Sequence, residues 1–111
     1  MSIGFVVSPE RSAEWRPDKM GKSTLHESNE MLVGLNAFEP GQSHASHSHA
    51  GTDKLYVVLE GEGIFSLADA EQPMRAGQLM VAPAGVPHGV RNSSGERLLV
   101  LAVMAPPPHR S

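Results

Sequence analysis

Three histidines fall within six positions of the stretch HASHSHAGTDK, residues 44–54, at His44, His47 and His49. Side chains two apart in a strand point to the same face, so His47 and His49 could chelate one metal ion. Imidazole nitrogen suits zinc, iron, copper and nickel. His44 lies three positions before His47, on the opposite strand parity, and we leave it out of the expected site. By itself the stretch is more typical of an exposed polar loop than of a metal site.

A distant histidine, His88, lies in PAGVPHGV at residues 83–90, among two prolines and two glycines. Residues that fix the backbone in this way hold a neighbouring side chain in place. A lone histidine in such a loop is more often structural. Combined with His47 and His49 at the ends of separate strands, His88 would complete a three-histidine metal site.

The elements that must position these side chains are predicted to be short strands. Glycine and proline supply 11 and 9 of the 111 residues, and such frequent interruption disfavours ordinary helices. Turn signals recur about every ten residues, which is typical of an all-β sandwich or barrel. Residues 8–30 are polar and carry no clear period. We expect strands at 31–38, 54–61, 64–68, 78–82 and 97–105, and an edge strand or arm at 1–7. A helix over 98–105 is the alternative for the last apolar segment.

Together these residues resemble the motifs of the cupin superfamily. The first cupin motif, a glycine, five residues, H-x-H, then a glutamate and a second glycine, is matched from Gly41 through His47 and His49 to Gly61. The second motif is matched at Gly77, Pro83, Gly85, His88 and Asn92. The resemblance implies a small double-stranded β-helix, or jelly-roll barrel, usually a homodimer, over residues 31–105. Residues 1–30 would then form an N-terminal arm that packs on the barrel, and residues 106–111 a tail.

The resemblance also implies a divalent metal ion, held by His47, His49 and His88, that could be zinc, iron, manganese or nickel. The glutamate that cupins commonly add falls on Lys54. Asp53 could replace it only if a bulge corrects the one-residue slip. We favour a site of three histidines without a carboxylate. A barrel that has lost the metal is the third alternative.

Lys54 either turns away to pair with an acidic neighbour or lies over the pocket and holds an anionic ligand against the metal. Tyr56 has the same strand parity and would line the same interior. We therefore expect Lys54 and Tyr56 to bind ligand, whereas no residue is singled out as catalytic. Four further residues of the interior are expected to be core: Phe38, Phe65, Met80 and Val90. Trp15 and Leu25 are expected to anchor the N-terminal segment, and Asn92 to be a turn residue.

Charge and composition exclude several classes of protein. The formal net charge is −3, and the basic residues are scattered, which argues against a nucleic-acid partner. No apolar run approaches the roughly 20 residues of a membrane span, and no signal segment is evident, so we expect a cytoplasmic protein. The predicted partner is a small molecule, anionic if Lys54 faces the pocket. The protein would act on it as a metal-dependent enzyme of dioxygenase or isomerase type, or bind it as a non-catalytic sensing module.

Overall fold

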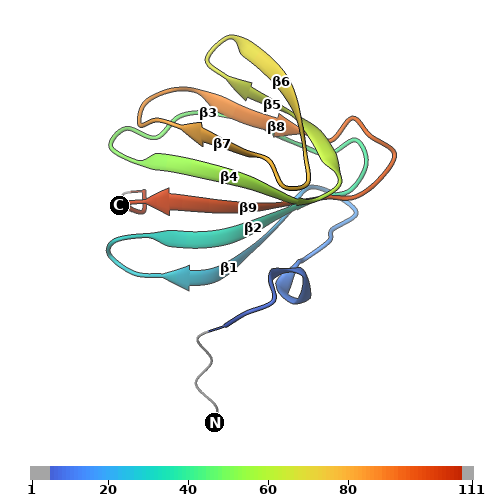
Figure 1. The fold of residues 1–111 in the computed structure, drawn as a ribbon, viewed down its shortest axis with the longest axis horizontal. Helices are drawn as coiled ribbons and strands as arrows, with labels where there is room; N and C mark the ends of the chain where they lie inside the picture. Colours follow the sequence, from blue (N-terminus) through green and yellow to red (C-terminus); the bar gives the residue numbers. More distant parts are fainter. Residues whose placement is uncertain (1–5, 109–111) are drawn as a thin grey trace.

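A computed structural model describes residues 6–108 as two antiparallel sheets packed face to face (Figure 1). The five-stranded sheet has the order β1-β2-β9-β4-β7, and the four-stranded sheet has the order β3-β8-β5-β6. The strands are β1 Gly21–Glu27, β2 Leu32–Phe38, β3 Ser43–His47, β4 Asp53–Glu60, β5 Glu62–Leu67, β6 Ala70–Arg75, β7 Leu79–Ala82, β8 His88–Arg91 and β9 Leu98–Ala105. The prediction of an all-β fold is confirmed. Among the described residues no helix is long and apolar enough to cross a membrane, the one helix being the 3₁₀ turn Pro9–Ser12.

Strands that carry apolar residues were predictable. β2, β4, β5, β7 and β9 lie where strands were expected. The alternative of a helix over 98–105 is wrong, because β9 pairs with β2 on one side and β4 on the other. Its residues Leu98, Leu99 and Val100 are all buried, so this central strand has apolar side chains on both faces.

Strands with a weak apolar signal were missed. β1 lies in the polar segment 8–30, at the edge of its sheet, with a bulge between Thr24 and His26. β6 contains Pro73 and is also an edge strand, a position that proline tolerates because its missing N–H faces away from the ladder. Of the strand or arm expected at 1–7, residues 1–5 lie outside the described part, and Val6 and Val7 are exposed and not in a strand.

The main core lies between the two sheets. Along β4 every second residue is buried, which is the pattern of a strand with one face on a core. The buried inner cluster comprises Met20, Phe38, Tyr56, Val58, Phe65, Met74, Val90, Leu98, Val100 and Ala102, with Met80 packed against it. Phe38, Phe65, Met80 and Val90 are therefore core residues, as expected.

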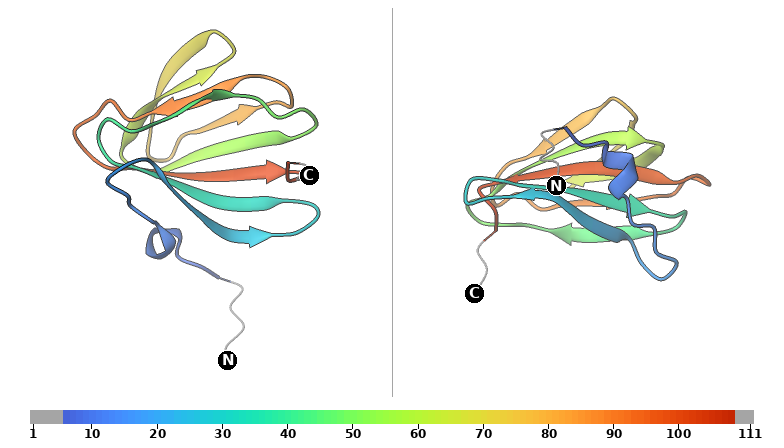
Figure 2. Two further views of the ribbon diagram at one scale, coloured as in Figure 1. Left: turned by 180° about the vertical axis from the view of Figure 1, so that it is seen from behind. Right: turned by 90° about the horizontal axis from the view of Figure 1, so that it is seen from below.

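A smaller apolar cluster on the outer face of the five-stranded sheet holds the N-terminal segment. Trp15 and Leu25 pack against buried Leu35 and Leu99, which confirms the two expected anchors. The guanidinium carbon of Arg97 lies 4.5 Å from the centroid of the Trp15 ring. Figure 1 and the left view of Figure 2 show the segment running outside the strands, beside β1.

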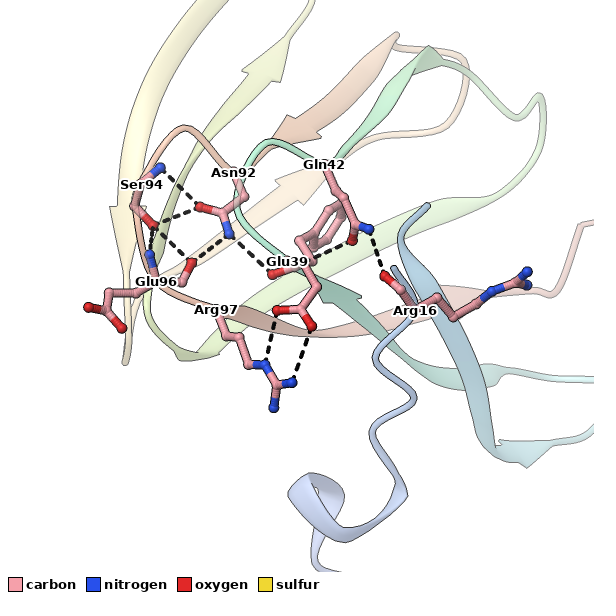
Figure 3. Close-up of polar contacts among 8 residues, drawn as sticks. Arg16, Glu39, Gln42, Asn92, Ser94, Glu96 and Arg97 are labelled. Atoms are coloured by element: carbon pink, nitrogen blue, oxygen red, sulfur yellow. Dashed lines mark hydrogen bonds and ion pairs between the residues drawn. The ribbon is translucent and has the colours of Figure 1, made fainter. Parts of the chain in front are cut away.

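Asn92 organises the turn that follows β8 (Figure 3). Its amide nitrogen donates to the carbonyl oxygens of Phe38 at 3.1 Å and Glu96 at 2.7 Å. Its amide oxygen accepts from the backbone N–H of Ser94 at 3.1 Å. The turn residue expected here is confirmed, and it closes one end of the molecule.

Candidate functional site

The histidines gather at the opposite end of β8. His47 at the end of β3 and His88 at the start of β8 are cross-strand partners, and their ring centroids are 4.4 Å apart. The ring of His49, two residues beyond the end of β3, lies 5.1 Å from His47 and 6.2 Å from His88. The structure thus brings together the three histidines that the sequence singled out.

Two hydrogen bonds fix the loop of His49 against the turn that precedes His88. The N–H of Gly85 donates to the carbonyl oxygen of His49 at 3.0 Å. The N–H of Ala84 donates to Oδ1 of Asp53 at 2.8 Å. Gly85 has φ of +80°, in the left-handed region that favours glycine, which explains the motif glycine at this turn. Asp53 is exposed and engaged in this turn, so the structure favours a site without Asp53 as a ligand.

His44 belongs to the same cluster, contrary to expectation. His44 pairs with Val90 and His47 pairs with His88, so three steps along β3 match two along β8. This bulge returns the side chain of His44 to the face that carries His47. Their ring centroids are 4.3 Å apart. The prediction for His44 from strand alternation was wrong because nothing in the sequence marks the extra residue.

Backbone carbonyls orient two of the rings. Nδ1 of His47 lies 2.8 Å from the carbonyl oxygen of Ala45, and Nδ1 of His88 lies 3.0 Å from that of Val86. A carbonyl can only accept, so each Nδ1 carries the proton and each Nε2 keeps its lone pair. Nε2 of His88 is buried and has no hydrogen-bond partner in the described chain. Metal-binding histidines are commonly oriented by such a bond from the other ring nitrogen.

The imidazoles are held in the neutral form. Burial is the main cause of the lowered pKa of His47, His49 and His88, and the charge of Lys54 lowers all three further. Burial lowers the pKa of His44 to about 3. Neutral imidazole is the form that binds a metal ion.

Lys54 lies on the inner face of β4 and is only 5% exposed. Its Nζ is 4.7 Å from the centroid of the Tyr56 ring. Burial, followed by the charge of Lys22, lowers the pKa of Lys54 to about 8. None of the ion pairs within residues 6–108 includes Lys54. The alternative in which Lys54 pairs with an acidic neighbour is therefore not what the structure shows.

A cavity of about 300 Å³ adjoins the histidines. It is lined by Lys22, Ser23, Thr24, Leu32, Gly34, Leu35, Asn36, His44, His47, His49, Lys54, Ala102, Met104 and Pro108. No aspartate or glutamate of the described chain lines it, whereas two lysines do. Tyr56 and His88 do not line this cavity, and their ring centroids are 5.8 Å apart behind its wall of histidine and lysine side chains. The hydroxyl of Tyr56 is buried without a hydrogen-bond partner among the described residues, and burial raises its pKa.

The histidine side chains are chemically suited to a divalent metal ion, but the structure does not place them around a single point. Within residues 6–108 no group of three or more His, Asp or Glu side chains is placed so that it could hold a metal. His47 and His88 nevertheless present the oriented ring, and His88 the buried unpartnered Nε2, that a metal ligand needs. Ligation would therefore require side-chain adjustment within the cluster.

Comparisons with known proteins find matches to both the sequence and the fold. The family model described as "Cupin domain" matches residues 34–104. The crystal structure of TT1209 from Thermus thermophilus superposes with a TM-score of 0.90 at 42% sequence identity, over 93% of this chain and 98% of that chain.

Two curated relatives are named for binding small molecules. The oxalate-binding protein of Thermotoga maritima is 27% identical over 106 residues, which cover 88% of this chain and 87% of that protein. Auxin-binding protein 1 of Arabidopsis thaliana is 32% identical over 95 residues, which cover 78% of this chain and 48% of that protein. This chain thus spans about half the length of the plant relative.

Proposed function

Because the chain belongs to the cupin family, we propose that it binds a small anionic molecule in the cavity beside its histidines. The observation that carries this proposal is Lys54, a buried lysine that lines the cavity and has no carboxylate partner in the described chain. Burying an unpaired charge is costly, and an anion in the cavity would offset that cost.

The ligand's anionic group would meet several donors. The Lys54 ammonium provides a charge-assisted hydrogen bond to a carboxylate, which is stronger than a neutral one. The phenol of Tyr56 stays protonated, since burial raises its pKa, and its hydroxyl is free to donate. Both residues were expected to bind ligand. The position of Lys54 on the cavity wall supports that role, whereas Tyr56 is buried behind the wall and would reach the ligand only if side chains moved.

We further propose that His47, His49 and His88 hold a divalent zinc, iron, manganese or nickel ion. The chain has no cysteine and so no thiolate ligand, which leaves imidazole nitrogen as the ligand that suits these metals here. When bound, such an ion would supply a Lewis acid beside the anion site. The carbonyls of Ala45 and Val86 would keep two of the rings in the ligating tautomer.

A metal-dependent enzyme of dioxygenase or isomerase type is the second candidate function. It is favoured by the donor set, because three histidines without a carboxylate leave coordination positions open for a substrate. The names of the oxalate-binding and auxin-binding relatives favour binding. Turnover of the bound anion would indicate an enzyme, whereas binding without turnover would indicate a non-catalytic binding protein.

Calorimetric titration of tag-free protein with oxalate, acetate and butyrate tests the anion site. We expect Lys54→Met to weaken binding of these anions about tenfold or more, as the loss of one charge-assisted hydrogen bond predicts. Lys19→Met is the matched control, because Lys19 is exposed and does not line the cavity. Equal affinity of the parent and Lys54→Met for every anion would contradict the proposal.

We also propose that the protein forms a homodimer. Leu79 and Val81 lie on β7, at the edge of the five-stranded sheet, and both are exposed large apolar side chains. Contiguous exposed apolar surface is typical of protein contacts. Light scattering coupled to size-exclusion chromatography measures the mass directly, and a mass of 11.9 kDa would show a monomer instead.

A further inference from the structure

The cavity has a second basic residue that no cupin motif includes. Lys22 lies on β1, the edge strand of the five-stranded sheet, and lines the same cavity as Lys54. None of the ion pairs within the described chain includes Lys22. The cavity therefore contains two cationic side chains and no carboxylate of the described chain.

The two lysines approach the cavity from different strands. β2 and β9 lie between β1 and β4 in the sheet order, and neighbouring strands are about 4.8 Å apart, so the axes of β1 and β4 are about 14 Å apart. On those two intervening strands, Gly34 and Ala102 are cross-strand partners that line the cavity. Their small size leaves open space between the lysines, where larger residues would fill the sheet's inner face.

Both apolar and polar side chains line this space. Leu32, Met104 and Pro108 line it, as does His44. Nδ1 of His44 is buried and has no hydrogen-bond partner in the described chain. The charge of Lys22 is among the causes of the lowered pKa of both His44 and Lys54, so its ammonium lies near both groups.

We propose that Lys22, with His44 beside it, is a second anion-binding subsite, and that the cavity selects a dicarboxylate with a short apolar spacer. One carboxylate would contact Lys54, the other would contact Lys22, and the methylene spacer would lie over Gly34 and Ala102. This inference rests on the proposed anion site at Lys54 and adds the specificity of that site. Lys22 acts in it as a specificity-determining residue.

Titration calorimetry with succinate and butyrate, matched acids of four carbons, tests the second subsite. We expect the parent to bind succinate about tenfold more tightly than butyrate, the effect of one additional charge-assisted contact. Lys22→Met should lower succinate affinity to about that of butyrate and lower butyrate affinity much less. Lys22→Arg, which keeps the charge, should retain the preference, and Lys19→Met should behave as the parent.

The outcomes separate this inference from the proposal on which it rests. Equal binding of the two acids by the parent, or equal losses for both in Lys22→Met, would overturn the second subsite and leave the Lys54 site standing. Binding of neither acid, and of neither oxalate nor acetate, would overturn both. Thermal melting of each variant checks that it is folded, and an exposed edge-strand residue such as Lys22 can be replaced without disturbing the core.

Discussion

The two ends of the barrel differ in whether their buried polar groups have partners within the described chain. At the end that follows β8, Asn92 is 1% exposed, and both its amide nitrogen and its amide oxygen have partners in the chain. At the end where β8 begins, Lys54 is buried without a carboxylate partner in residues 6–108, and Nε2 of His88 and the Tyr56 hydroxyl have no hydrogen-bond partner there.

The contrast separates polar groups that hold the fold from polar groups that are available to a ligand. Buried polar groups in folded proteins are almost always hydrogen-bonded, so each exception needs an explanation. Unpartnered groups cluster beside a cavity at one end, which points to a ligand. Substitutions at the two ends should therefore have opposite consequences for stability and binding.

The largest effect on stability is expected for Asn92→Ala. The substitution removes every hydrogen bond of the buried side chain, including the one to the buried carbonyl oxygen of Phe38, so the free energy of unfolding should fall by about 2–4 kcal/mol. Denaturant titration measures this. Anion binding should be unchanged per folded molecule, and a loss of binding as large as that of Lys54→Met would contradict the separation of the two ends.

His88→Ala should abolish metal binding while leaving the protein folded. The parent is expected to hold about one ion per chain after reloading, and the variant much less, because only His47 and His49 of the three proposed ligands remain and each lost ligand weakens binding. Elemental analysis of tag-free protein gives the ratio. His26→Ala, a replacement in β1 at a histidine outside the cavity, is the matched control. Equal metal in the parent and His88→Ala would exclude the proposed ligand set.

Lys54→Met should stabilise the protein, in contrast to Asn92→Ala. The pKa of Lys54 is lowered from 10.5 to about 8 in the folded chain, so between these pH values the unfolded state binds more protons. The free energy of unfolding of the ligand-free parent should consequently rise as pH increases from 8 to 10.5. Melting curves over this range should show that rise in the parent and a smaller one in Lys54→Met. Identical pH profiles would indicate that Lys54 is not desolvated.

His44→Phe should change how the stability of the protein depends on acid pH. The pKa of His44 is lowered from 6.5 to about 3 in the folded chain, so the unfolded state binds the proton first as pH falls. Stability of the metal-free parent should therefore decrease from pH 6.5 downwards. The variant should lose less stability over the same interval in chemical denaturation. A parent and a variant with the same acid dependence would show that burial of His44 does not oppose its protonation.

The apolar strands and the motif residues were predictable from local sequence. β4 and β9 carry dense apolar signals, and His47, His49 and His88 stand at fixed spacings from glycines and prolines that set the turns. β1 and β6 were missed because edge strands need few apolar residues. His44 was misplaced because a bulge changes strand parity without any residue to mark it.

The family, the all-β class and the clustering of His47, His49 and His88 could be predicted without coordinates, because they depend on residue types at short, fixed spacings. Three properties required the folded chain: Lys54 is buried without a carboxylate partner in residues 6–108, Asp53 is engaged in a turn, and Lys22 shares the cavity. Those properties depend on which strands lie side by side. Pairing of β1, β2, β9 and β4 brings together residues up to about 80 positions apart, and no local pattern encodes that arrangement.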